Sequence, residues 1–179
     1  SVPNSRTTMS AECHALHLLV GALPQHGFPF DSDRIPENGI YVLFESGETA
    51  HGGSRIVRVG THTGVRQLRS RLEQHFCKEN KDRSVFRKNI GRALLQRAVD
   101  PFLADWNLDL TTAAARHLHG ARIDRVKQAA VECEVTAYVQ RRCRFVVIPL
   151  EGKLDRLKWE SRMVSTVAAC DECSPSVGW

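Results

Sequence analysis

Two short runs of β-branched and aromatic residues, separated by a glycine-rich segment, most constrain how this chain folds. The first run spans 39–44 (Gly-Ile-Tyr-Val-Leu-Phe) and the second spans 55–60 (Arg-Ile-Val-Arg-Val-Gly). Such runs favour β-strands, and the turn-rich connection over 46–54 predicts that the two strands pair as an antiparallel hairpin. A third apolar run at 145–148, closed by Pro149, predicts a strand buried on both faces.

Helical periodicity accounts for most of the remaining chain. Apolar residues at helical spacing predict helices over 9–23, 65–77, 84–98, 111–119, 124–142 and 154–169. The segment 82–84 and Asp124 offer N-caps for two of them. This order of elements predicts an α+β fold, with a small three-stranded antiparallel sheet flanked by helices. The length of 179 residues suits one domain, and we divide it into an N-terminal helical extension, 1–30, and a main domain, 31–179.

Charge and composition narrow the class of protein. The chain has 25 Lys and Arg against 20 Asp and Glu, which gives a formal net charge of +5. This excess permits a polyanionic partner without requiring one. No apolar run approaches the roughly 18 residues that a membrane span needs, and the first residues lack the apolar segment of a signal peptide. We therefore expect a cytoplasmic protein.

The six cysteines are too sparse for a disulfide scaffold. Cys170 and Cys173 form a C-x-x-C pair, which is half of a zinc site, and His117 and His119 are candidates for the other two ligands. The spacing does not demand a metal, so free thiols are the favoured interpretation and no chemistry is assigned to the pair. Cys133 falls within an apolar helical pattern and is expected in the core.

The helix predicted after the hairpin places two polar side chains beside its buried stripe. Leu68, Leu72 and Phe76 repeat every four residues, and a helix turns about 100° per residue. Arg71 and His75 therefore border this stripe, where a guanidinium and an imidazole form a prepared anion site. The alternative is that Arg71 covers apolar surface with its stem while His75 bonds to a backbone carbonyl; without other evidence, this alternative is favoured.

Glu160 and Tyr41 each allow a structural and a functional interpretation. Glu160 lies in the middle of the apolar face of the last predicted helix, where a carboxylate needs a cation beside it. That cation is either Arg71, in a structural salt bridge, or a divalent ion such as Mg²⁺, which keeps most of its waters and binds substrate phosphate. Tyr41 either packs as an ordinary strand aromatic or accepts a proton, which requires a cation nearby.

Together these residues form an ordered pattern along the chain. The order is Gly-Ile-Tyr over 39–41, Arg-Val-Gly over 58–60, Arg71-x-x-x-His75, and Glu160 on a late helix. This pattern resembles the GIY-YIG nuclease superfamily, closely over 39–76 and more loosely over 155–168. Members of that superfamily include homing endonucleases, some restriction enzymes and the incision subunit of bacterial excision repair.

The resemblance implies hydrolysis of phosphodiester bonds with one divalent ion, Mg²⁺ or Mn²⁺. By position, Glu160 would bind the metal, and Tyr41 would activate the attacking water or be activated itself. Arg71 would hold the scissile phosphate, and His75 would assist proton transfer or orient the phosphate. Thr61 occupies the place where relatives often carry Lys or Ser beside the site. DNA is the implied partner, with RNA and a homodimeric assembly as open alternatives.

Departures from the family pattern keep other functions open. Arg58 stands where the second motif has a tyrosine, and it either supplies cationic assistance or impairs the site. The loop between the two motifs is longer than usual, and relatives carry an Asn after the metal-binding Glu, whereas no Asn follows Asn107 here. The leading hypothesis is a divalent-metal-dependent DNA endonuclease of restriction or mobile-element type. The alternatives are a nucleic-acid-binding module with weak or no catalysis, and a protein-interaction domain in which Glu160 and Arg71 form a buried ion pair.

Basic residues around the helix predicted over 84–98 would bind the polyanion. The candidates are Arg83, Arg87, Lys88 and Arg92. With an inner stripe of Phe86, Ile90 and Leu94, the last three candidates fall away from the buried side and would contact phosphates without reading sequence. A solvated helix face is the alternative. Any sequence preference would come from the segments 46–54 or 100–120, or from dimerisation.

Overall fold

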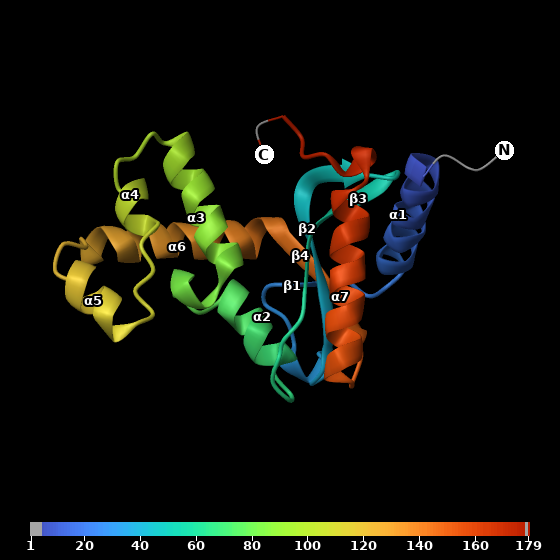
Figure 1. Cartoon of the computed structure of the whole chain (residues 1–179), viewed down its shortest axis with the longest axis horizontal. Helices are drawn as coiled ribbons and strands as arrows, with labels where there is room; N and C mark the ends of the chain where they lie inside the picture. The colour runs from blue at the N-terminus through green and yellow to red at the C-terminus, as the bar shows by residue number, and fades with distance from the viewer. Residues whose placement is uncertain (1–4, 178) are drawn as a thin grey trace. The chain divides into compact units, whose positions relative to one another are not determined.

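The chain forms two compact units in the computed structural model, which describes residues 5–177 and 179 (Figure 1). Unit 1 comprises the chain up to Arg71 together with Arg142–Trp179, and unit 2 comprises Leu72–Arg141. The prediction of one domain and the division at residue 30 both stay predictions, and the first four residues of the N-terminal extension lie outside the described residues.

Unit 1 is built on an antiparallel sheet. Its strands are β1 (His26–Gly27), β2 (Gly39–Ala50), β3 (Gly53–Gly60) and β4 (Cys143–Pro149), in the order β1-β4-β2-β3. The predicted hairpin and the third strand are confirmed, and so is the α+β class. The sheet has four strands rather than three, because β1 is a two-residue strand too short to leave a pattern in the sequence.

The hairpin reaches further than its sequence indicated. We expected a loop over 46–54, but β2 and β3 extend through most of it and only His51 and Gly52 remain as the turn. The φ angles of these two residues are 53° and 75°, as in the tight turns that suit the twist of a two-stranded hairpin. The long connection between the two motifs is therefore an extended β-ribbon, and the prediction of a loop over 46–54 is wrong.

Two helices of unit 1 cover one face of the sheet. They are α1 (Ser5–Gly21) and α7 (Lys153–Ala168), which pack against β3 and against each other (Figure 1). The core between helices and sheet consists of Val20, Ile40, Val42, Phe44, Ile56, Val59, Val146 and Met163. Side chains alternate along a strand, so Tyr41 and Leu43, which are both fully buried, lie on the opposite face. This alternation determines where the predicted catalytic residues lie.

Helices make up unit 2. The chain enters it within α2 (Leu68–Phe76) and continues through η2 (Lys81–Arg83), α3 (Val85–Arg97), α4 (Leu103–Trp106), α5 (Ala113–His119) and α6 (Arg125–Arg142). The predicted N-caps are confirmed: Ser84 Oγ accepts from the N–H of Arg87 at 3.1 Å, and Asp124 Oδ1 accepts from that of Lys127 at 2.9 Å. None of the helices in the described part of the chain has the length and apolar character that crossing a bilayer requires.

The buried stripe of α3 is rotated from the predicted one. Its buried residues are Phe86, Arg87, Gly91 and Leu95, rather than Phe86, Ile90 and Leu94. The rotation follows from Trp106, whose indole packs so tightly on Gly91 that a Cβ there would lie 2.2 Å from the ring. Cys133 on α6 is also placed differently from the prediction, because it is exposed rather than in the core.

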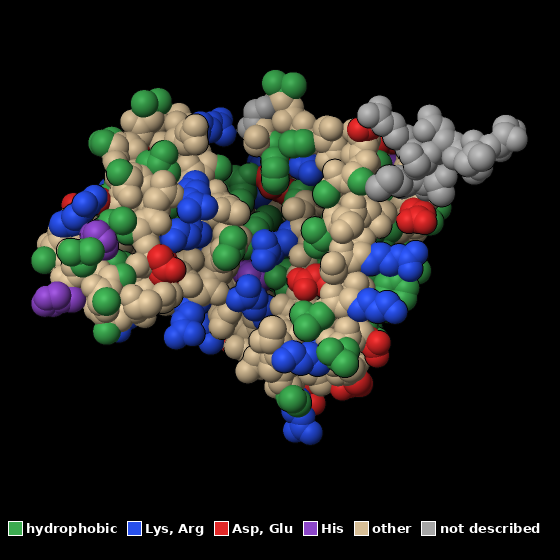
Figure 2. All heavy atoms as spheres, viewed as in Figure 1, with side chains coloured by type: hydrophobic (Ala, Val, Ile, Leu, Met, Phe, Trp, Pro, Cys, Tyr) green, Lys and Arg blue, Asp and Glu red, His purple; other side chains and the backbone are tan. Residues whose placement is uncertain are grey.

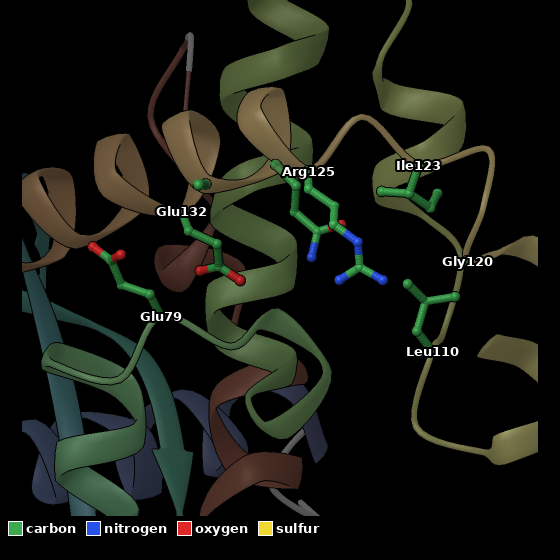
Figure 3. Close-up of a pocket in the computed structure, with 8 residues that line it drawn as sticks. Glu79, Leu110, Gly120, Ile123, Arg125 and Glu132 are labelled. Atoms are coloured by element: carbon green, nitrogen blue, oxygen red, sulfur yellow. The ribbon is translucent and has the colours of Figure 1, made fainter.

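A pocket of about 210 Å³ opens in unit 2. Glu79 and Glu132 lie on one side of it, and Arg125 and Leu110 lie on the other (Figure 3). Glu132 is only 3% exposed and already accepts from Lys81 N and from Arg87. The predicted catalytic residues are absent from the lining of this pocket, and the buried Glu132 carboxylate beside it is paired with residues of unit 2.

Candidate active site

Tyr41, Arg58 and Gly60 share one face of the sheet in unit 1. Tyr41 pairs with Gly60 across the β2–β3 ladder, and Leu43 pairs with Arg58. Directly opposite residues in an antiparallel pair point to the same side, which here is the face away from the core under α1 and α7. Residues from the two sequence motifs are thus brought together by strand pairing alone.

Gly60 allows the phenol of Tyr41 to cross over β3. A Cβ added to Gly60 would lie 2.2 Å from the Tyr41 oxygen and 2.4 Å from the ring carbon that carries it. Real side chains do not approach so closely, so only glycine leaves room for the phenol in this position. The Val-Gly of the second motif therefore has a steric role, which is to seat the tyrosine of the first.

Arg58 supplies a cation to this phenol. Its Nε donates to the Tyr41 oxygen in a long hydrogen bond of 3.4 Å. Arg58 is half-buried, whereas Tyr41 is fully buried. Arg58 stands where the family's second motif has a tyrosine, and it faces Tyr41. This is the position that Arg58 needs if it assists Tyr41 as a cation.

Glu160 meets the sheet where β3 ends. Its Oε1 accepts from the backbone N–H of Thr61 at 3.2 Å, which fixes the carboxylate from α7 at the residue that follows Gly60. We expected Glu160 in the middle of an apolar face, but the carboxylate is half-buried, because the buried side of α7 follows Arg156 and Met163. A fixed carboxylate with partial access to solvent can serve as an oxygen ligand to a hard divalent cation.

The residues after β3 bind back to the start of β2. Thr61 Oγ1 donates to Gly39 O at 2.7 Å, and His62 Nε2 accepts from Gly39 N at 3.3 Å. The other ring nitrogen of His62 lies 2.8 Å from Gly64 O, where it donates. Burial holds the pKa of His62 below its usual value; the bond to Gly64 opposes this shift and the nearby Arg156 adds to it. A neutral His62 thus locks together the two motif strands.

The first turn of α2 is anchored to the same region of unit 1. Leu68 N donates to Glu37 O at 3.1 Å, and Arg69 Nε donates to Ile35 O at 2.7 Å. Leu68 also approaches Gly39, where a Cβ would lie 3.2 Å from its Cδ2. Arg71 follows within the same turn and is half-buried. The predicted stripe of α2 is confirmed, since Leu68, Leu72 and Phe76 are all fully buried.

His75 lies one turn after Arg71 on α2, within unit 2, and it is completely buried. Its Nδ1 is 2.8 Å from Ser84 Oγ, and its ring meets Phe86 edge-on at 5.6 Å between centroids. The same serine that caps α3 therefore fixes the orientation of this imidazole. Nothing in the sequence linked Ser84 to His75.

A comparison with models of protein families tests the resemblance found in the sequence. A model of the GIY-YIG domain matches residues 29–179. The chain belongs to the GIY-YIG nuclease superfamily. No curated protein and no solved structure matches it. Membership gives the chain the domain of a nuclease family, while its particular reaction, its metal and its substrate are matters for proposal.

Of the four basic residues that were predicted to bind the polyanion, Arg87 does not lie where the GIY-YIG chain's sequence indicated. It is fully buried, and its guanidinium bonds to Glu132, Thr136 and the His75 carbonyl. It therefore holds unit 2 together instead of facing solvent. Arg83 is exposed, and Lys88 and Arg92 are half-buried. Figure 2 shows Lys and Arg side chains at the surface of both units.

Sequence reasoning missed the residues that support the site. His62, Ser84 and Asn38 hold motif residues or their strands in place, and the amide of Asn38 accepts from Arg66 N at 2.8 Å. Ser84 carried a signal as a helix cap, but a cap says nothing about a distant imidazole. For His62 and Asn38, the only signal is that they adjoin motif residues, Thr61 and Gly39.

Proposed function

We propose that this chain is a divalent-metal-dependent endonuclease that hydrolyses DNA phosphodiester bonds. Two contacts near the end of β3 support the proposal: Arg58 donates to the Tyr41 oxygen, which lies against Gly60, and Glu160 accepts from the N–H of Thr61, the residue that follows Gly60. Tyr41 and Arg58 come from paired strands, and Glu160 comes from α7. The membership in a nuclease superfamily supports the same reading.

Each residue has a role that follows from its chemistry. The Tyr41 oxygen, facing the Arg58 guanidinium, accepts the proton of the attacking water. Arg71 holds the scissile phosphate by charge-assisted hydrogen bonds. Thr61 fixes the Glu160 carboxylate through its backbone N–H. His75, fixed by Ser84, assists in proton transfer or orients the phosphate.

Glu160 is the proposed metal ligand. Its half-buried carboxylate is an oxygen donor, which matches the preference of Mg²⁺ and Mn²⁺ for carboxylates and water. The bound ion would supply stabilisation of the charge that develops on the phosphate. We assign the ion no further ligand from the chain, since no Asn follows Asn107.

DNA is the proposed substrate, and a restriction or mobile-element setting in the cytoplasm is part of the proposal. Exposed and half-buried basic residues near α3 would contact the phosphates; they are Arg83, Lys88 and Arg92. Because Arg87 is buried in an ion pair, we remove it from this surface. RNA as substrate and a homodimeric assembly remain alternatives to be measured.

The experiment that tests the proposal is cleavage of supercoiled plasmid by the purified chain. With Mg²⁺ or Mn²⁺ we expect nicked and linear products, and with EDTA we expect none. Retention of the same DNA on a filter is measured in parallel. Absence of nicking with every divalent ion tested, under conditions where DNA is retained, would contradict the proposal.

That contrary outcome would favour the second candidate, a nucleic-acid-binding module on the same scaffold. Arg58 in place of the second tyrosine favours this candidate. The hydrogen bond of 3.4 Å from Arg58 to the Tyr41 oxygen supports the first candidate instead, since it gives Arg58 a partner within the first motif.

A further inference from the structure

Four metal-ligating side chains meet in unit 1, and none of them belongs to the nuclease motifs. Cys13 comes from α1, His51 from the β2–β3 turn, and Cys170 and Cys173 from the ends of η3 (Asp171–Cys173). Their ligand atoms all lie within 4.8 Å of one another. The three cysteines are buried, and the side chain of His51 is only 1% exposed. The cluster thus completes the C-x-x-C pair with two ligands that the sequence did not connect to it.

The sequence predicted either free thiols at Cys170 and Cys173 or a metal site completed by two histidines. His117 and His119, the two candidates from the sequence, belong to α5 of unit 2. Cys13 lies about 160 positions before Cys173, and nothing in the spacing signals that they meet. The hairpin turn that carries His51 was expected to be part of a longer loop.

Distances within the cluster match those between ligands of a tetrahedral zinc ion. Zinc binds thiolate sulfur at about 2.3 Å and imidazole nitrogen at about 2.0–2.1 Å. A tetrahedron with these bonds places two sulfurs about 3.8 Å apart and a sulfur and a nitrogen about 3.6 Å apart. The Sγ atoms of Cys13 and Cys173 are 3.5 Å apart, and Cys170 Sγ is 3.3 Å from His51 Nε2.

The carboxylate of Glu172 orients the His51 ring toward the cluster. Its Nε2 faces Cys170, and its Nδ1 lies 3.4 Å from Glu172 Oε2. The other oxygen of Glu172 accepts from Ser10 Oγ at 3.0 Å. Metal-ligating histidines almost always direct their second nitrogen to a carboxylate, a carbonyl or water. The carboxylate of Glu172 is therefore an observation independent of the four ligands.

The neighbouring His17 is excluded as a ligand by its own hydrogen bonds. Its Nδ1 lies 2.9 Å from Cys13 O, and its Nε2 accepts from Ile56 N at 3.2 Å. The same nitrogens also lie 3.6 Å from Cys13 Sγ and 3.8 Å from Cys173 Sγ. Because both are committed to the backbone, we take His51 as the nitrogen ligand. His51 also has a left-handed backbone conformation, with φ of 53°. This conformation is unfavourable for residues other than glycine, and here the hairpin turn imposes it.

We propose that Cys13, His51, Cys170 and Cys173 form a structural zinc site. Soft thiolates with one imidazole select zinc over Mg²⁺ or Ca²⁺. Four protein ligands leave no open coordination position for a substrate, so the ion is structural rather than catalytic. It joins the N-terminal helix, the hairpin turn and the C-terminal segment, and metal binding therefore adds to the folding free energy of unit 1.

The positive charge of Arg55 lies beside the negatively charged site. Three thiolates and a zinc ion carry a net charge of −1, and Arg55 lies beside them, donating from Nη1 to Cys173 O at 3.3 Å. Arg55 is itself paired with Glu48 at 2.7 Å. Since Arg55 belongs to β3, the site is connected to the strand that carries Arg58 and Gly60. The proposal does not rest on nuclease activity.

The test is the metal content of the chain, purified without chelators and without a metal-binding tag. We expect one zinc ion per chain by atomic spectroscopy. Cys173→Ser should lose it, whereas Cys133→Ser, which removes an exposed thiol outside the cluster, should keep it. Added Co²⁺ should give the metal-free chain a thiolate-to-cobalt charge-transfer band and the visible bands of tetrahedral cobalt. Retention of zinc by Cys173→Ser would overturn the proposal.

A second variant covers the case in which Cys173→Ser does not fold. Glu172→Gln keeps all four ligands but removes the carboxylate beside His51. Its loss should weaken zinc binding about 10- to 100-fold, measured by competition with a chromophoric chelator. Unchanged affinity in this variant would contradict the assigned role of Glu172. A folded wild-type chain that holds no zinc and shows no cobalt bands, or that contains a Cys13–Cys173 disulfide, would overturn the site itself.

Discussion

The phenol of Tyr41 lies against Gly60 so closely that a Cβ on the glycine would come within 2.2 Å of the phenol oxygen. The two residues pair across β2 and β3, so neither can move without shifting the hairpin. Gly60→Ala should therefore displace the tyrosine. We expect at least a tenfold loss of plasmid cleavage and a drop of about 1–3 kcal/mol in unfolding free energy, as overpacking typically causes.

The matched control for Gly60→Ala is Gly53→Ala, in the same strand. A Cβ on Gly53 would meet nothing within 4 Å, so its stability should change by less than about 0.5 kcal/mol. Cleavage by Gly53→Ala should equal that of the wild type. Equal behaviour of the two variants would show that Gly60 does not seat Tyr41.

Arg58 is predicted to assist Tyr41 as a cation. Arg58→Leu removes the guanidinium that donates to the phenol oxygen, so the Tyr41 oxygen loses a charged hydrogen-bond donor. We expect plasmid cleavage to fall about tenfold. Arg58→Lys, which keeps a positive charge, should show a smaller loss. Unchanged cleavage by Arg58→Leu would rule out this role.

Arg87 is predicted to stabilise unit 2 and to take no part in binding DNA. Its guanidinium is 2.7 Å from Glu132 and fully buried, and removal of one partner from such a pair costs about 3–5 kcal/mol. Arg87→Leu should therefore lower stability strongly in denaturant unfolding. Arg83→Ala, at an exposed position, should leave stability nearly unchanged and weaken DNA retention, more so at low salt. The reverse pattern would restore Arg87 to the binding surface.

The stability of unit 1 is predicted to depend on the charge of His62. Burial lowers its pKa, the bond to Gly64 and the nearby Glu151 oppose that shift, and Arg156 adds to it. The folded chain therefore binds this proton less readily than the unfolded chain, and stability falls as pH drops below the usual histidine value of about 6.5.

Unfolding free energy, measured from pH 7.5 to 5.5, tests this dependence. The wild type should lose stability across this window, and His62→Gln, which does not titrate, should lose less. His119→Gln on α5 is the control, and it should follow the wild type. An identical pH dependence for His62→Gln and the wild type would contradict the role assigned to His62.

Local sequence patterns predicted the elements well. The stripe of Leu68, Leu72 and Phe76 and the caps at Ser84 and Asp124 depend on neighbours three or four positions away, and such relations are visible in the sequence. The hairpin was also visible, but its length was not. Glycines at 47, 52 and 53 suggested a loop, whereas tertiary packing continues both strands up to a two-residue turn.

Residues whose environment is set by distant partners escaped prediction. Arg87 looked like a solvent-facing cation on its helix, and only the approach of Glu132, 45 positions later, buries it. The order of the motifs marks Tyr41 and Glu160 as candidates, whereas the contacts of His62 and Ser84 are ones that no spacing rule encodes. The same holds for Cys13 and His51, which join the C-x-x-C pair only in three dimensions.

The most direct test of the nuclease account compares wild type with Glu160→Gln under single-turnover conditions with saturating protein. Asp155→Asn, an exposed acid on the same helix, is the control. The account predicts that Glu160→Gln retains DNA like the wild type but cleaves it at least ~100-fold more slowly with Mg²⁺, while Asp155→Asn cleaves normally. Equal cleavage by Glu160→Gln and the wild type would contradict it.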